Sequence, residues 1–159
     1  MRRKLQTFRV VFWDFDGVIK DSVSAKTKAF RKLFAPYGTE VQELVQKHHE
    51  ANGGVSRFEK IPYYFKEYIG RTLTNEEEVR WCQRFSQEVL DKVCLSPWVP
   101  GVLEYLQINC KKQLFYLVTA TPQEEIEIIL ERLKLKDFFN GVYGVHRKKE
   151  CILKELLEK

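Results

Sequence analysis

The chain has 159 residues, of which 44% are hydrophobic, and this length suffices for one well-packed core with a small appended lobe. Its net charge of +5 is a mild excess with lysine, arginine and glutamate interleaved, which fits small anionic ligands and argues against nucleic-acid binding. The start of the chain is basic, but the apolar run that follows it is short and ends at Asp14, which argues against a signal peptide or a membrane span. Four scattered cysteines indicate a reducing compartment. We therefore expect a cytoplasmic protein without a membrane partner.

The first predicted strand, residues 8–13, is an apolar run that ends at two carboxylates, Asp14 and Asp16. Its lack of polar alternation predicts a parallel strand covered by helices, with the reactive crevice at its carboxyl end. Two carboxylates this close repel each other, so a bound cation or a catalytic task explains them better than stability does. Mg²⁺ prefers such oxygen ligands, and an aspartate can act as a nucleophile while its neighbour transfers protons. The alternative is an aspartate pair that only caps a turn.

Asp14-Phe15-Asp16-Gly17-Val18, followed by Asp21-Ser22, resembles the first motif of the haloacid dehalogenase superfamily of phosphohydrolases. The resemblance implies that Asp14 forms an aspartyl-phosphate and that Asp16 serves as general acid and base. It also implies Mg²⁺ as cofactor, held by Asp14 and by the backbone carbonyl of Asp16, and a small phosphorylated substrate.

Residues 20–95 carry only helical patterns. We expect helices from Ser22, over about 39–50, from near Ser56 and from Thr74, where Thr74 and Glu77 form a capping box. An all-helical insertion after the first strand predicts a cap over the crevice. This placement is similar to the superfamily's subgroup that contains β-phosphoglucomutase and phosphoglycolate phosphatase. The expected domains are an α/β core (1–19 and 96–159) and a helical cap (20–95).

The loop Gly53-Gly54-Val55-Ser56-Arg57 is the informative part of the cap. Glycines let the backbone approach a ligand closely, and a guanidinium suits a phosphate or carboxylate. The loop resembles the substrate-specificity loop of the β-phosphoglucomutase-like cap, which implies substrate contacts from Gly54, Ser56, Arg57 and Lys60. The alternative is that Ser56 caps a helix and Arg57 lies on the surface. Adjacent His48 and His49 diverge on a helix, so we expect surface or hinge residues and no shared metal.

The rest of the chain alternates helix and strand. Pro100 begins a helix, strands cover 113–118 and 141–144, and helices cover 122–135 and 149–158. This order is typical of a doubly wound sheet, so we expect a Rossmann-like three-layer α/β/α core that is incomplete at its C-terminal end.

Two further residues are candidates for phosphate binding. Thr119 ends a buried strand, where its hydroxyl and the backbone N–H groups around Ala120 can face phosphoryl oxygens; this resembles the second motif of the superfamily. The alternative is a helix N-cap, a task that Thr121 can also take. Lys149 begins the last helix, where a cation opposes the dipole unless an anion is near. The third motif of the superfamily favours Lys149, with Lys148 as its rival and a solvated basic run as the alternative.

The resemblance also implies a fourth motif, an acidic pair after a further strand, which the sequence through Lys159 does not contain. The chain is then a fragment of a longer enzyme, a short protein with weak or lost catalysis, or one completed by a second chain. Without that strand, residues 8–13 form an apolar edge, so we expect weak activity and dimerisation through this edge. The predicted function is a Mg²⁺-dependent phosphatase acting on a small phosphomonoester such as a sugar phosphate. The alternatives are binding of a phosphorylated ligand without turnover and, within the first class, a phosphomutase.

Overall fold

The structure, a computed structural model, describes residues 9–145 and 149–157 and contains a parallel sheet of three strands. The strands are β1 (Val10–Trp13), β2 (Leu114–Val118) and β3 (Gly141–Tyr143), in the order β1-β2-β3. Val10 pairs with Leu114, and Tyr116 pairs with Gly141, so the carboxyl ends of all three strands lie at the same edge. The predicted first strand is confirmed from Val10 onward; residue 8 lies outside the described residues.

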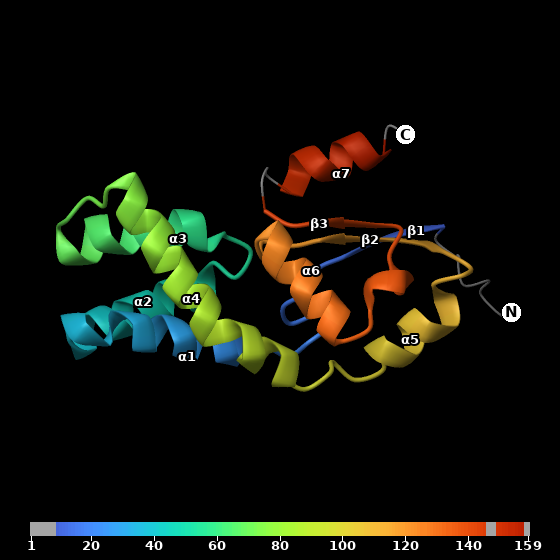
Figure 1. Cartoon of the computed structure of the whole chain (residues 1–159), viewed down its shortest axis with the longest axis horizontal. Helices are drawn as coiled ribbons and strands as arrows, with labels where there is room; N and C mark the ends of the chain where they lie inside the picture. Colours follow the sequence, from blue (N-terminus) through green and yellow to red (C-terminus); the bar gives the residue numbers. More distant parts are fainter. Residues whose placement is uncertain (1–8, 146–148, 158–159) are drawn as a thin grey trace, which may run out of the picture.

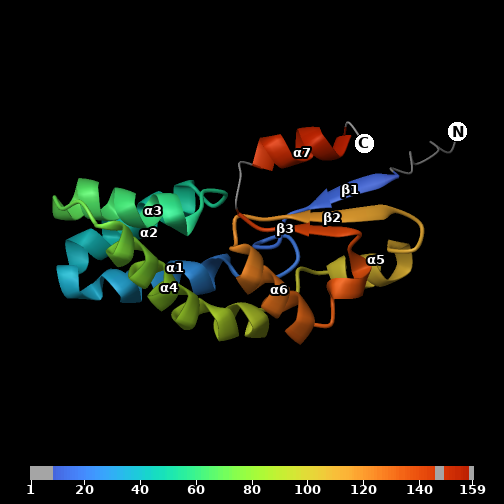
Figure 2. The ribbon, with the colours of Figure 1, turned by 45° about the horizontal axis from the view of Figure 1, so that its top comes forward.

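Helices cover the two faces of this sheet (Figures 1 and 2). On one face lie α5 (Val102–Asn109) and α6 (Gln123–Arg132), and on the other lies α7 (Lys149–Leu157). The predicted three-layer α/β/α fold is confirmed. Helix α6 is shorter than expected because Lys134 has a left-handed φ of 55°, which ends the helix before residue 135.

The face of the sheet toward α5 and α6 is the better packed one. Trp13 and Phe115 meet with ring centroids 5.4 Å apart, and Trp13 lies 5.8 Å from the ring of Tyr105 in α5. On the opposite face, Val10 and Leu114 remain 37% and 45% exposed. The expectation that β1 is buried on both faces is therefore wrong, because β1 has a strand neighbour on one side only within the described residues and α7 covers part of one face. Pairing of this edge with a second copy of the chain stays a prediction.

A helical lobe lies beyond the carboxyl edge of the strands (Figure 1). It contains α1 (Val23–Phe34), α2 (Thr39–Ala51), α3 (Arg57–Tyr64) and α4 (Asn75–Leu95), and a wider helical turn, Phe65–Ile69, continues α3. All four expected helices are present, and Thr74 and Glu77 form the expected capping box. The lobe stands where a cap over the crevice would stand, and its treatment as a separate domain stays a prediction.

Aromatic side chains fill the interior of the helical lobe. Phe34 of α1 is fully buried, and its ring lies 5.5 Å from Tyr64, 5.4 Å from Phe65 and 5.9 Å from Trp81. Buried aromatic pairs contribute large apolar areas and specific contacts, so this cluster holds α1, α3 and α4 together. It thereby fixes the position of the loop between α2 and α3, which faces the carboxyl edge of the sheet.

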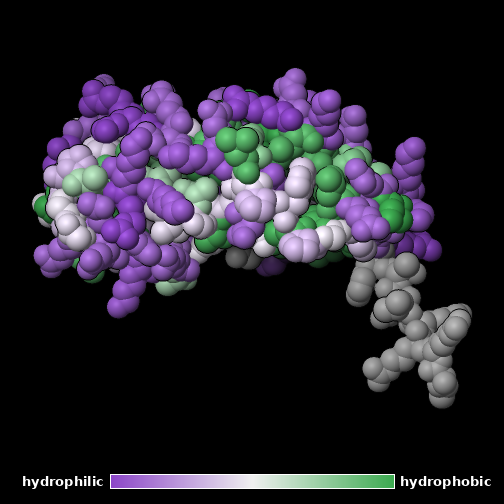
Figure 3. Space-filling view, turned by 90° about the horizontal axis from the view of Figure 1, so that it is seen from below, coloured by the Kyte–Doolittle hydropathy of each residue, from purple (hydrophilic) through white to green (hydrophobic). Residues whose placement is uncertain are grey.

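The surface differs between the two halves of the molecule. Seen from below, the helical end is mostly hydrophilic, whereas hydrophobic residues gather over the sheet-bearing half (Figure 3). Within the described part of the chain, none of the helices combines the length and the apolar character needed to cross a bilayer.

Candidate functional site

A cavity of about 220 Å³ opens at the carboxyl edge of the sheet. Its wall includes Asp14 and Asp16 from the loop after β1, Gly53 and Gly54 from the helical lobe, and Ala120 from the loop after β2. The Asp14 carboxylate accepts a hydrogen bond from the Phe15 amide (2.8 Å). The structure thus brings together residues that the sequence analysis assigned to the site from three separate segments.

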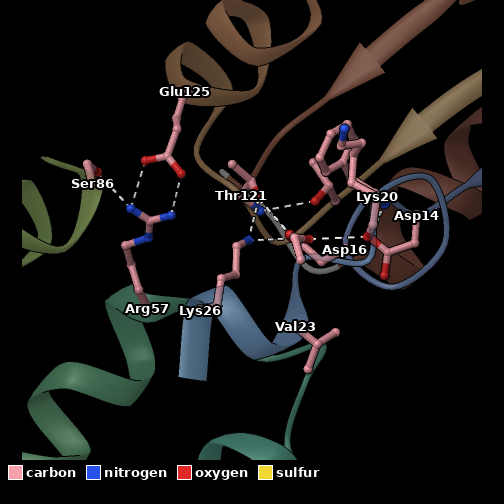
Figure 4. A network of polar contacts seen from close by, with 12 residues as sticks. Asp14, Asp16, Lys20, Val23, Lys26, Arg57, Ser86, Thr121 and Glu125 are labelled. Carbon is pink, nitrogen blue, oxygen red and sulfur yellow. Dashed lines mark hydrogen bonds and ion pairs between the residues drawn. The ribbon is translucent and has the colours of Figure 1, made fainter. Parts of the chain in front are cut away.

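Three side chains hold the carboxylate of Asp16 in place (Figure 4). The hydroxyl of Ser22 donates a hydrogen bond to Oδ1 (2.6 Å), the ammonium group of Lys26 pairs with Oδ2, and the hydroxyl of Thr121 also donates to Oδ2 (3.3 Å). Burial by itself raises the pKa of Asp16, but the charge of Lys26 and the three hydrogen bonds outweigh it, and the pKa is lowered. Asp16 is therefore an ionised carboxylate at neutral pH.

Lys26 is a site residue that the sequence analysis missed. Besides pairing with Asp16, its Nζ donates a hydrogen bond to the hydroxyl of Thr121 (3.0 Å), which joins α1 of the helical lobe to the loop after β2. The sequence held a signal for this position, because Lys26 lies four residues before Phe30, which belongs to the apolar face of the predicted helix. That spacing places Lys26 on the inner face of the helix.

Thr119 lies at the end of β2 and is 2% exposed. Its amide donates a hydrogen bond to the carbonyl of Tyr143 (3.0 Å), and its hydroxyl accepts one from the amide of Thr121 (3.2 Å). The alternative interpretation as a helix N-cap is wrong for both threonines, because Pro122 is the N-cap residue of α6 and no side chain caps it. The pairing of Trp13 with Leu117 puts Asp14 and Thr119 at the same edge of the sheet, where a phosphate role for Thr119 stays a prediction.

The lysine of the predicted third motif is only partly covered by the structure. Lys149 is the first residue of α7, and its side chain lies outside the described residues. Lys148, the rival position, lies outside them as well.

Ser56 is the N-cap of α3, and its hydroxyl accepts a hydrogen bond from the amide of Phe58 (3.2 Å). The alternative interpretation of Ser56 as a helix cap is therefore confirmed. Arg57 does not lie on the surface, so that part of the alternative is wrong: its side chain is 4% exposed and forms a two-pronged ion pair with Glu125 in the first turn of α6 (2.6 and 2.8 Å). A contact between Arg57 and a substrate stays a prediction.

Glu125 is the second site residue that the sequence analysis missed. Its negative charge fits the first turn of a helix, where the dipole favours acidic side chains. Its position gave a signal, because Glu125 lies four residues before Ile129, which is fully buried. Its side chain is 7% exposed, consistent with a place on the inner face of α6.

Lys60 and His49 form a buried pair at the far side of the site. The Nζ of Lys60 lies 2.9 Å from the Nδ1 of His49, and the two residues are 1% and 4% exposed. Burial, with the nearby charges of Lys60 and Lys26, lowers the pKa of His49 to about 3, so the ring is neutral and accepts the hydrogen bond. The prediction of a surface or hinge histidine is wrong for His49, which α2 directs into the interior, whereas half-buried His48 approaches the hydroxyl of Tyr64 (3.3 Å).

A smaller cavity of about 30 Å³ lies beside the first one and shares Asp16, Lys26, His49, Gly53 and Ala120 with it. Arg57 and Lys60 complete its cationic lining. The predicted substrate residues Gly54 and Ala120 thus border the first cavity, while Arg57 and Lys60 border the second.

The family model of haloacid dehalogenase-like hydrolases matches residues 11–158, nearly the whole described chain. The chain belongs to this family. The match includes the aspartate loop, the helical lobe and the strand–helix units that surround the two cavities. A search of curated proteins finds no relative of this haloacid dehalogenase-like chain.

Solved structures share its fold. β-Phosphoglucomutase from Clostridium difficile aligns with a TM-score of 0.70 and 21% identity, over 90% of this chain and 64% of that one. A predicted phosphoglycolate phosphatase from Haemophilus somnus gives 0.64 and 16%, over 89% and 64%. A haloacid dehalogenase-like family hydrolase from Streptococcus pneumoniae gives 0.63 and 15%, over 95% and 69%. The haloacid dehalogenase-like chain thus spans about two thirds of the length of these proteins.

The donor set of this haloacid dehalogenase-like site fits a magnesium ion that keeps part of its water shell. Mg²⁺ is commonly held by one or two carboxylates together with substrate phosphate, and Asp14 brings a carboxylate to the cavity wall. The Asp16 carboxylate already binds Ser22, Lys26 and Thr121, which leaves its backbone carbonyl as the predicted ligand. Residues 9–145 and 149–157 contain no group of three or more histidine, cysteine, aspartate or glutamate side chains placed to hold a metal.

Replacing Lys60 with methionine is expected to stabilise the protein at pH 7 by about 2 kcal/mol, the cost of burying the ammonium less the lost hydrogen bond to His49. Burial and the charge of Lys26 lower the pKa of Lys60 from 10.5 to about 8. Between pH 8 and 10.5 the folded chain therefore holds fewer protons than the unfolded chain, and wild-type stability rises with pH. The advantage of the variant shrinks over this range.

Urea unfolding followed by tryptophan fluorescence at pH 7 and pH 9.5 measures both effects of the Lys60 substitution. The control is Lys66→Met, because the Lys66 side chain is 74% exposed and its loss leaves stability nearly unchanged at either pH. A Lys60 variant that is less stable than wild type at pH 7, or whose advantage is the same at both pH values, contradicts the prediction.

Proposed function

We propose that the protein is a phosphatase that hydrolyses a small phosphomonoester, such as a sugar phosphate, through an aspartyl-phosphate on Asp14. The observation that supports this proposal most is a cavity of about 220 Å³ that is lined from both parts of the molecule. Asp14 and Asp16 border it from the loop after β1, and Gly53 and Gly54 border it from the helical lobe. That volume is below the roughly 300–1,000 Å³ of a typical ligand pocket, so the ligand must be small. Family membership supports the same class of reaction.

In the proposed reaction, a carboxylate oxygen of Asp14 attacks phosphorus, and the bond between phosphorus and the ester oxygen breaks as the protonated form of Asp16 gives its proton to that oxygen. Water then attacks the aspartyl-phosphate, Asp16 accepts the proton of this water, and Asp14 leaves as a carboxylate. Thr119 and Lys149 are the proposed ligands of the remaining phosphoryl oxygens. Mg²⁺, held by Asp14 and the Asp16 carbonyl, would offset the repulsion between the Asp14 carboxylate and the phosphate.

The ionised state of Asp16 suits the second step, in which it acts as a base. The first step needs a proton on the leaving oxygen unless the leaving group is stable as an anion. We therefore expect p-nitrophenyl phosphate, whose leaving group is a stable anion, to be hydrolysed more readily than an alkyl phosphate. The helical lobe limits water access to the cavity and selects the alcohol part of the substrate.

The test is the release of p-nitrophenolate by the purified chain with Mg²⁺ and with excess EDTA. The proposal expects release with Mg²⁺ that stops in EDTA. Equal rates in both conditions contradict it. A second candidate, binding of a phosphorylated ligand without turnover, is supported by the firm pairing of Asp16 with Lys26. It predicts binding of orthophosphate, seen by calorimetry, with no release of p-nitrophenolate.

A further inference from the structure

Both terminal nitrogens of the Arg57 guanidinium group are hydrogen-bonded to groups of the protein itself. Its two terminal nitrogens bind the two carboxylate oxygens of Glu125 at 2.6 and 2.8 Å, and Nη1 also donates to the hydroxyl of Ser86 (2.7 Å) (Figure 4). The ring of Phe85 packs against it at 4.5 Å. This is the arrangement in which an arginine binds a ligand carboxylate or phosphate, with a protein carboxylate in the place of the ligand.

Arg57 nevertheless borders the small cavity that also contains Asp16 and Lys26. A phosphomonoester with its phosphate beside Asp14 would occupy the larger cavity, and its far end would face the smaller one, whose volume of about 30 Å³ admits only a small terminal group. The far end of such a molecule would point toward Arg57. Whether this terminal group can be an anion depends on whether the Arg57 guanidinium is available to bind it.

Resting on the proposed phosphatase function, we propose that Glu125 determines specificity by acting as an internal anion for Arg57. While Glu125 is in place, a substrate's second anionic group has no free guanidinium to bind and faces a carboxylate instead. The site therefore accepts phosphomonoesters whose remaining part is uncharged and discriminates against those that carry a carboxylate or a second phosphate. The same ion pair ties α3 of the helical lobe to α6 beside the sheet.

The desolvation of both charges favours a role for the Arg57–Glu125 ion pair in specificity over an accidental contact. The side chains of Arg57 and Glu125 are 4% and 7% exposed, so each charge is out of water and depends on the other. A ligand anion that displaced Glu125 would leave that carboxylate buried without its partner, which opposes the exchange. Removing the charge of Glu125 lifts this opposition and frees a desolvated guanidinium for the ligand.

Two stable phosphonates test the proposal by calorimetry, because their C–P bonds are not phosphate esters. 3-Phosphonopropionate carries a carboxylate, and 3-hydroxypropylphosphonate has a hydroxyl in its place. Wild type is expected to bind the hydroxyl probe about threefold or more tightly than the carboxylate probe, whereas Glu125→Gln is expected to prefer the carboxylate probe by about tenfold or more, the effect of one charge-assisted contact.

Three further variants separate specificity from stability. Glu124→Gln changes the exposed neighbour in the same turn of α6 and is expected to keep the wild-type ratio. Arg57→Gln combined with Glu125→Gln removes both buried charges and is expected to return the ratio to about one. Glu125→Asp retains the charge on a shorter side chain and is expected to give an intermediate ratio, which covers the case in which Glu125→Gln does not fold.

The outcomes decide between the two proposals. A wild type that prefers 3-phosphonopropionate by about tenfold overturns the role of Glu125, since the ligand then displaces it. Ratios that are equal in wild type, Glu125→Gln and Glu125→Asp overturn it as well. A loss of affinity for both probes in equal proportion assigns Glu125 a structural role only. If neither probe nor orthophosphate binds any variant, the proposed phosphatase function itself fails.

Discussion

Replacing Asp14 with asparagine is expected to lower the Mg²⁺-dependent release of p-nitrophenolate by about a thousandfold or more, to the background of the assay. The amide has nearly the shape of the carboxylate, but its oxygen is a poor nucleophile and carries no charge for a cation. Apart from Asp14, the described carboxylate that borders the larger cavity is Asp16, whose oxygens are already bound by Ser22, Lys26 and Thr121. No neighbour among the described residues is therefore placed to take over the attack.

The same Asp14 variant should still bind orthophosphate, and more tightly than wild type in the absence of metal, because a like charge has been removed from the cavity. Calorimetry in EDTA measures this binding, and the control substitution is Asp137→Asn, which changes an exposed aspartate in a segment outside both cavities. Retention of more than about a tenth of wild-type turnover by the Asp14 variant would exclude Asp14 as the nucleophile.

The local features of the site could be predicted from the sequence. The apolar run before Asp14 predicted a strand, Gly53 and Gly54 predicted a close approach of backbone to the cavity, and the polar end of β2 predicted Thr119 at the same edge. Each of these depends on a few consecutive residues and on the rule that parallel strands present their carboxyl ends together. Long apolar periodicity likewise predicted the helical lobe and the three layers.

The charge pairs across the site could not be predicted in this way. Lys26 and Thr121 are 95 residues apart, and Arg57 and Glu125 are 68 residues apart, so only the packing of the helical lobe against the sheet brings them together. Sequence patterns assign charged residues to solvated faces, which is right for most of them. Here the helical spacing of Lys26 from apolar Phe30, and of Glu125 from apolar Ile129, indicated the inner faces of α1 and α6, but it gave no information about the partners.

A methyl group at Gly144 is expected to lower the free energy of unfolding by about 3 kcal/mol, because it would have to enter space already filled by backbone. Gly144 follows β3, and its amide donates a hydrogen bond to the side chain of Gln123 (2.5 Å). A Cβ at this position would lie 2.5 Å from both the Cα and the N of Gln123, the first residue of α6. Backbone cannot yield as a flexible side chain does, so β3 and α6 must move apart.

This displacement would reach the site through Thr121, whose carbonyl accepts a hydrogen bond from the amide of Val145 (3.0 Å) and whose hydroxyl donates one to Asp16. We therefore expect Gly144→Ala to lose turnover as well as stability, measured by thermal unfolding and by p-nitrophenyl phosphate hydrolysis on the same samples. The control is Gly70→Ala, where φ is 74° but no atom lies within 4 Å of the added Cβ. Backbone strain alone costs about 1 kcal/mol there, with turnover unchanged. A Gly144 variant as stable as the Gly70 variant would mean that α6 is not held against β3 at this point, and the geometry that aligns Thr121 with Asp16 would have to be supplied elsewhere.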